Sequence, residues 1–130
     1  MSKYLLFLGL AAAFIVSSCK KGPGEGGRAS ISGKVFQVDY NTSNVPVDSF
    51  YVGEQRVYLI YGDDASFSQE VRTNYDGTYV FNYLLTGNYT VFAYSECKTC
   101  AGKTKPVVLH TEINGRKEDK VLDDLVKENY

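Results

Sequence analysis

Two cysteines separated by two residues, Cys97 and Cys100, form the motif in this sequence with the most obvious chemistry. In an oxidising compartment such a pair usually forms a disulfide, which here would close a small loop between two strands. A redox enzyme uses the same spacing, but it needs a thiolate activated at the N-terminus of a helix. No alternation of strands and helices surrounds the pair. The sequence therefore favours a structural disulfide, and a redox or other enzyme that uses this pair is the alternative.

The remaining polar residues do not assemble into a recognisable catalytic or metal site. His110 is the only histidine, and it is out of phase with the apolar residues of its segment, which points it toward solvent. Structural zinc needs four ligands, and neither Asp63–Asp64 nor Asp123–Asp124 lies in a loop with calcium-binding spacing. No set of serine, histidine and aspartate stands at an informative spacing. We expect no enzyme activity, no metal and no cofactor.

The third cysteine, Cys19, follows a segment with the layout of a secretion signal. Residues 1–3 carry a positive charge, residues 4–16 are apolar and uncharged, and two small serines precede the cysteine. The apolar stretch is shorter than the roughly 20 residues of a transmembrane helix. With Cys19 set aside, the other two cysteines form an even count that suits one disulfide. We expect residues 1–18 to be a removable signal peptide.

The four residues Val16-Ser17-Ser18-Cys19 resemble the lipobox of bacterial lipoproteins. This resemblance implies a diacylglycerol on the sulfur of Cys19, cleavage before that cysteine, and acylation of the new amine. Several acyl chains hold a protein stably on a bilayer, because each buried CH₂ contributes about 0.8 kcal/mol. Lipoprotein sorting rules imply that lysine at position 20, rather than aspartate, favours the outer membrane. Which face of that membrane carries the protein stays open.

Residues 20–28, which read KKGPGEGGR, are dominated by glycine and separate the cysteine from the rest of the chain. Such a composition predicts a flexible tether that does not enter a core. Fully extended, it reaches about 30 Å at most. The predicted organisation is therefore a signal peptide at 1–18, a lipidated Cys19 with its tether at 19–28, and a folded domain at 29–130.

Composition indicates the class of that domain. The chain has 130 residues, enough for one domain, with 11 tyrosines, 12 glycines and no tryptophan. Aromatic and β-branched residues favour strands. Removal of the signal peptide takes Lys3 away and leaves 13 basic against 15 acidic residues, so the mature chain is slightly acidic. This argues against a nucleic-acid partner, which would require a basic face. We expect an all-β domain.

Alternating apolar residues and turn signals predict about seven strands, as in an Ig-like or prealbumin-like β-sandwich. A change of phase between Val35 and Phe36 predicts a β-bulge, and residues 41–51 form a long loop. For residues 121–126 a strand is preferred, with a short helix as the alternative. The predicted strands are 31–40, 56–61, 69–73, 78–83, 88–94, 106–113 and 121–126.

Residues 76–91, DGTYVFNYLLTGNYTV, resemble the DG-x-Y-x-F-x-x-L-x-x-G-x-Y-x-V pattern of carboxypeptidase-regulatory-like and related prealbumin-like, collagen-binding B-type domains. Residues 31–35, ISGKV, resemble the opening strand of that family. The resemblance implies a fold rather than an activity, because members serve as stalks, spacers, adhesin repeats or folding supports. It also implies that Gly87 permits a sharp corner and that the hydroxyl of Tyr89 reaches back to the backbone of that corner.

Several aromatic residues lie on the strand phase opposite the expected core or in the long loop. They form a candidate binding surface for a peptide or glycan, comprising Phe50, Tyr51, Tyr58, Tyr83, Phe92 and Tyr94. The sequence thus favours a membrane-tethered, non-catalytic interaction or structural module of the bacterial cell envelope. Its partners are expected to be the membrane, through Cys19, and an envelope protein or glycan. A subunit of a larger envelope assembly, with its edge strands paired to a partner, is a further alternative.

Overall fold

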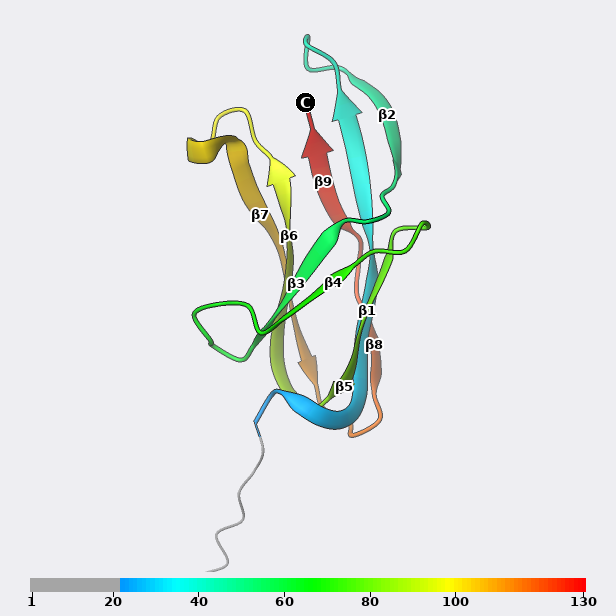
Figure 1. Cartoon of the computed structure of the whole chain (residues 1–130), viewed down its shortest axis with the longest axis vertical. Helices are drawn as coiled ribbons and strands as arrows, with labels where there is room; N and C mark the ends of the chain where they lie inside the picture. Colours follow the sequence, from blue (N-terminus) through cyan, green and yellow to red (C-terminus); the bar gives the residue numbers. More distant parts are fainter. Residues whose placement is uncertain (1–21) are drawn as a thin grey trace, which may run out of the picture.

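The computed structural model describes residues 22–130, so the signal peptide and Cys19 lie outside the described residues. The predicted all-β sandwich is confirmed: residues 22–130 form nine strands in two sheets, where about seven strands were predicted, and one 3₁₀ turn (Figure 1). No helix among these residues is long and apolar enough to cross a membrane. The elements are β1 (Glu25–Tyr40), β2 (Pro46–Tyr51), β3 (Arg56–Tyr61), β4 (Gln69–Arg72), β5 (Thr78–Leu84), β6 (Gly87–Glu96), η1 (Ala101–Lys103), β7 (Thr104–Ile113), β8 (Asp119–Val121) and β9 (Leu125–Asn129).

The two sheets differ in how they are assembled. One sheet has the regular antiparallel order β4-β3-β6-β7. The other is organised around the long strand β1, which runs most of the length of the molecule (Figure 1). Antiparallel β5 and β2 follow one another along one edge of β1, and parallel β8 and β9 follow one another along the other edge.

The β-bulge predicted near Val35 and Phe36 is wrong. Buried and less buried residues alternate without a change of phase, and Gln37 continues the buried face that begins at Ala29. Instead, β1 exchanges its neighbours at this point: β5 pairs with it as far as Lys34, and β2 pairs with it from Phe36. The apolar side chains that suggested a new phase belong to the outer face, where Phe36 packs on Tyr51 and Tyr40 stacks on Tyr130.

The folded domain begins earlier than position 29, so the predicted tether is too long. Residues 25–28 are the first residues of β1. The backbone N–H of Gly24 donates a 2.9 Å hydrogen bond to the hydroxyl of Tyr89, and its carbonyl accepts one from the N–H of Leu85. Glycine at position 27 allows close backbone approach: an added Cβ there would lie 1.9 Å from the carbonyl oxygen of Leu84. Part of the segment predicted to be a flexible tether therefore belongs to the packed domain.

Two strands were missed in segments with little alternation. All six residues of β2 are exposed and the strand opens with Pro46, which suits an edge position but carries no period-two signal. The C-terminal segment expected at 121–126 is divided into β8 and β9 by residues 122–124. Both pieces are strands, so the helical alternative is wrong.

The core lies between the sheets and contains the inward residues that alternation indicated. Tyr79 is one of its largest side chains, and its ring packs over Gly33, its cross-strand neighbour in β1. An added Cβ at Gly33 would lie 2.4 Å from the Tyr79 hydroxyl, so the glycine of the opening strand makes room for this tyrosine. The core residues are Ala29, Ile31, Val35, Val57, Leu59, Tyr79, Phe81, Leu84, Tyr89, Val91, Ala93, Ile113 and Leu125.

Candidate functional site

Four aromatic side chains meet on the outer face of the four-stranded sheet. Tyr58 is central: its ring stacks on Phe92 at a centroid distance of 4.9 Å and lies 4.9 Å from Phe67 and 5.7 Å from Tyr94. Phe92 and Tyr94 pack edge to face at 5.6 Å. We call these four residues the outer aromatic cluster. It resembles a small core that has no second layer above it.

Strand register assembles three of the four residues. Tyr58 lies between the buried Val57 and Leu59 and therefore points away from the core, and Tyr58 and Phe92 are direct cross-strand partners. Such pairs bring side chains to about 5 Å from each other. Tyr94 follows two residues after Phe92 on the same face. The alternation that fills the core thus also places these rings outside it.

Phe67 comes from the loop between β3 and β4 and was not among the predicted site residues. The N–H of Ser68 donates a 2.7 Å hydrogen bond to the carbonyl of Leu59, and its hydroxyl accepts one from the N–H of Tyr61. These bonds fold the loop back over β3 and bring Phe67 onto Tyr58. The available sequence signal was a single aromatic residue in a segment of small and polar residues.

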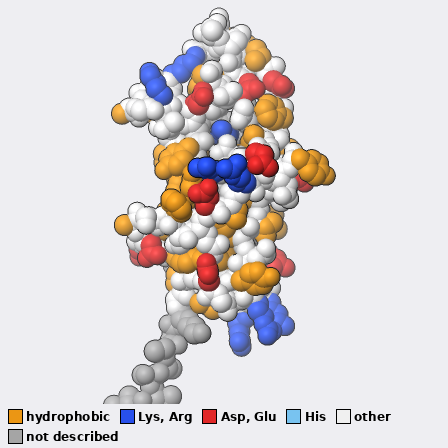
Figure 2. Space-filling model, viewed as in Figure 1, with side chains coloured by type: hydrophobic (Ala, Val, Ile, Leu, Met, Phe, Trp, Pro, Cys, Tyr) orange, Lys and Arg blue, Asp and Glu red, His pale blue; other side chains and the backbone are white. Residues whose placement is uncertain are grey.

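The outer aromatic cluster remains accessible and has a polar rim. Phe67 is 49% exposed and Tyr94 is 48% exposed. Val108 and Pro106 extend the apolar surface onto β7, while the Arg56–Glu70 ion pair at 3.4 Å and the Thr90–His110 hydrogen bond at 2.9 Å lie on the same sheet. Figure 2 shows hydrophobic side chains at the surface on the left of the molecule, beside the charged side chains near its centre. Tyrosine is enriched at interfaces because its ring is apolar and its hydroxyl is polar, so this surface is a candidate for binding.

The predicted binding surface is therefore only partly one site. Tyr58, Phe92 and Tyr94 are brought together, but Phe50 and Tyr51 lie on β2 in the other sheet. Tyr83, at the end of β5, is 75% exposed and takes part in none of the aromatic pairs among the described residues. Phase along one strand could not reveal this separation, because it does not say which sheet a strand joins.

Tyr51 is held by contacts within the domain. Its ring packs edge to face on Phe36, with the ammonium of Lys34 4.7 Å from the ring centre. Its hydroxyl donates a 2.9 Å hydrogen bond to Asp124, and this bond raises the pKa of Tyr51. One of the acidic residues considered as metal ligands is thus a hydrogen-bond acceptor for a tyrosine.

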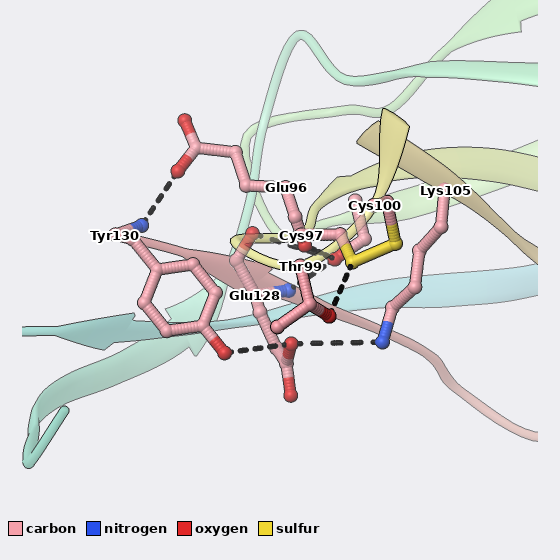
Figure 3. Close-up of polar contacts among 8 residues, drawn as sticks. Glu96, Cys97, Thr99, Cys100, Lys105, Glu128 and Tyr130 are labelled. Carbon is pink, nitrogen blue, oxygen red and sulfur yellow. Dashed lines mark hydrogen bonds and ion pairs between the residues drawn. A yellow bond between two sulfur atoms is a disulfide. The ribbon is translucent and has the colours of Figure 1, made fainter. Parts of the chain in front are cut away.

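Cys97 and Cys100 form a disulfide at the end of β6, with their Cα atoms 5.4 Å apart (Figure 3). Cys97 is nearly buried, and η1, which follows Cys100, is only three residues long. The last residues of the chain dock beside this loop: the N–H of Tyr130 donates a 2.6 Å hydrogen bond to Glu96, and its hydroxyl donates to Glu128. The bridge therefore lies where β6, β7 and β9 converge.

Within residues 22–130, no three histidine, cysteine or acidic residues gather in an arrangement that could hold a metal ion. His110 is exposed, as its strand phase predicted, and its Nδ1 pairs with the hydroxyl of Thr90. Asp63 and Asp64 line a shallow hollow with Pro23 and Gly87. Compared with His110 and the Asp63–Asp64 pair, the outer aromatic cluster is the better candidate for a binding site.

Comparisons with known proteins leave the family of this chain unassigned. No family model and no curated relative matches it. Among solved structures, a Pseudomonas aeruginosa protein proposed to bind carbohydrate is similar, with 14% identity, a TM-score of 0.48, and coverage of 77% of this chain and 90% of that chain. An (S)-allantoin synthase matches with 14% identity, a TM-score of 0.43, and coverage of 78% of this chain and 42% of that chain. Similarities this distant carry no argument about function.

Proposed function

We propose that the mature protein is a lipid-anchored, non-catalytic interaction module of the bacterial cell envelope, and that it binds its partner through the outer aromatic cluster. The observation that carries this proposal is the exposed packing of Tyr58, Phe67, Phe92 and Tyr94 on one sheet face. Aromatic side chains supply much of the binding energy at interfaces, because they bury a large area with few rotatable bonds.

The proposed anchor is Cys19, held at the outer membrane as the lipobox-like sequence implies. We further propose that the domain is of the carboxypeptidase-regulatory-like or prealbumin-like kind. The DGTYVFNYLLTGNYTV segment supports this, since its aspartate and glycine form the turn before β5 and its second glycine begins β6. A domain of this kind serves as a support or binding unit.

Two observations favour binding over redox catalysis by the Cys97–Cys100 pair. The described residues contain no α-helix whose N-terminus would lower the pKa of a thiol. In addition, Ser95 and Glu96, which directly precede the pair, hydrogen-bond to Glu128 and Tyr130 at the C-terminal end, which suits a structural bridge. The outer aromatic cluster, by contrast, includes two rings that are about half exposed although they add nothing to the core.

The test compares two double variants of the full protein in its own cells. Phe67→Ser with Tyr94→Ser removes the two more exposed rings of the outer aromatic cluster. Tyr75→Ser with Tyr83→Ser removes two rings that are 95% and 75% exposed and lie elsewhere. Affinity capture from mild-detergent extracts, followed by mass spectrometry and by glycan arrays, measures what each retains. We expect the first variant to lose a ligand that the wild type and the second variant keep.

Equal retention by both variants, or equal loss, contradicts binding at the outer aromatic cluster. The anchor is tested separately, by the mass of the N-terminal peptide from the membrane fraction and from a Cys19→Ser version. Acyl chains on Cys19 are expected. A peptide without them overturns the anchor and leaves the result for the aromatic cluster standing.

A further inference from the structure

We propose that the end of the sandwich where the described chain begins docks onto an anionic lipid surface through Arg28, Arg116 and Lys117. We call this surface the basic end. The orientation rests on the proposed anchor at Cys19, whereas the affinity for anionic lipid can be measured without it. In this orientation the basic end faces the bilayer and the outer aromatic cluster lies on a side face of the domain.

Few residues separate Cys19 from the folded domain along the chain. Gly24 is bound to the hydroxyl of Tyr89, and an added Cβ at Gly87 would lie 2.8 Å from the ring of Pro23, so Pro23 packs closely there. Only three residue steps separate Cys19 from Gly22. Three residues span at most about 11 Å, instead of the roughly 30 Å of a tether that reaches position 28.

This distance is comparable to the range of electrostatic attraction in salt solution. The Debye length is about 8–10 Å at physiological ionic strength. A lipid on Cys19 therefore keeps the adjoining end of the domain within reach of headgroup charges. The charge of this end therefore affects the orientation of the domain on the membrane.

Three cations lie together at that end of the domain. Arg28 comes from β1, and Arg116 and Lys117 come from the turn between β7 and β8. Together with the corner between β5 and β6 they line an open hollow of about 1050 Å³ that has no acidic lining residue. Figure 2 shows basic side chains gathered at the lower end of the molecule, where the described chain begins.

None of the three cations forms an ion pair with another residue in the described part of the chain, and all three are exposed. One nearby carboxylate, that of Glu118, is held by other partners. Glu118 accepts hydrogen bonds of 2.8 and 3.0 Å from the N–H groups of Asn114 and Gly115 and lies 3.4 Å from the ammonium of Lys120. The three cations of the basic end are thus exposed and without an ion-pair partner among the described residues.

Leu85 adds an apolar contribution at the same hollow. It lies at the corner between β5 and β6 and is only partly buried. Cations beside an accessible leucine match the boundary between phosphate groups and acyl chains. Each lysine or arginine near an anionic bilayer strengthens binding about fivefold, so three of them account for a factor of roughly 100.

The experiment is flotation of the mature chain, residues 19–130 with Cys19→Ser, with lipid vesicles at low salt. This chain contains the whole described domain and carries no acyl chains. Vesicles of phosphatidylcholine alone are compared with vesicles that also contain phosphatidylglycerol. The docking variant is Arg28→Gln, Arg116→Gln and Lys117→Gln. The control is Lys98→Gln, Lys103→Gln and Lys105→Gln, which makes the same change in net charge around the 3₁₀ turn at the opposite end (Figure 1).

We expect the wild type and the control to float with the anionic vesicles only, and this binding to disappear in 0.5 M salt, where the Debye length is roughly 4 Å. The docking variant is expected to bind on the order of 100-fold more weakly, with an unchanged thermal unfolding midpoint. Binding that is equal on the two kinds of vesicle, or that weakens equally in the docking and control variants, overturns the proposal. If Cys19 carries no acyl chains in cells, the proposed anchor is wrong. A positive flotation result would still show that the basic end binds anionic lipid.

Discussion

The hydroxyl of Tyr89 accepts a 2.9 Å hydrogen bond from the backbone N–H of Gly24, which lies 65 residues earlier in the chain. The same hydroxyl donates a 2.7 Å hydrogen bond to the carbonyl of Leu85. The corner before β6, which the sequence indicated, is therefore also the point that holds the start of the domain. This contact holds the start of the described chain at the end of the sandwich that we propose faces the membrane.

Replacement of Tyr89 by phenylalanine is expected to destabilise the domain. The ring would still fill its place in the core, but the N–H of Gly24 and the carbonyl of Leu85 would both lose their partner. Leaving a buried polar group without a partner costs about 1–3 kcal/mol. Urea denaturation followed by circular dichroism should show this decrease in the free energy of unfolding.

The matched control for that measurement is Tyr75→Phe, since Tyr75 is almost fully exposed. It removes the same hydroxyl from a place where water replaces it, so its free energy of unfolding should stay within about 0.5 kcal/mol of the wild type. Equal stability of the two variants would show that the Tyr89 hydroxyl does not hold the N-terminal segment.

Tyr79 should behave in the opposite way, because its buried hydroxyl has no hydrogen-bond partner among the described residues. Tyr79→Phe removes a hydroxyl that was desolvated without forming a hydrogen bond. The free energy of unfolding at pH 7 should therefore stay equal or rise by about 1 kcal/mol. Urea denaturation of this variant beside Tyr89→Phe compares two buried tyrosines that differ in their partners. A loss as large as that of Tyr89→Phe would contradict this account.

Alkaline pH should destabilise the wild type through the same residue. Burial raises the pKa of Tyr79 far above its ordinary value, with a smaller contribution from the charge of Asp124. The unfolded chain releases this proton near pH 10 while the folded chain keeps it, so the stabilising contribution is complete below pH 10 and is lost progressively above it. Urea midpoints between pH 8 and 11.5 should fall less steeply for Tyr79→Phe than for the wild type, and parallel curves would exclude Tyr79 as the cause.

Loss of the disulfide should lower stability without changing the fold. The bridge closes a loop with a sequence separation of 3, for which the chain-entropy model gives about 2 kcal/mol. Cys97→Ser with Cys100→Ser should lower the free energy of unfolding by that amount, and so should reduction of the wild type. A pair that glutathione reduces readily, with no change in unfolding, would favour the redox alternative instead.

Alternation along each strand was sufficient to predict the class of fold and most of the core. β3 has the predicted bounds, and the inward residues of β5 and β6 are those that a period of two indicates. This success has a local cause, because successive side chains of a strand point to opposite faces whatever its neighbours are. The cysteine pair and the outward position of His110 were predictable for similarly local reasons.

The tertiary structure alone decided which strands lie together, and this depends on contacts between distant segments. The sequence predicts that Phe92 and Phe50 both lie outside the core, but only Phe92 is the cross-strand partner of Tyr58. Gly27 has the composition of a linker, yet the backbone of Leu84 packs against it. Sequence therefore determined which face each strand buries, because that is a property of the local backbone. The aromatic cluster, the short connection and the basic end exist only once the sheets are packed, because hydrogen bonds and close packing between remote residues create them.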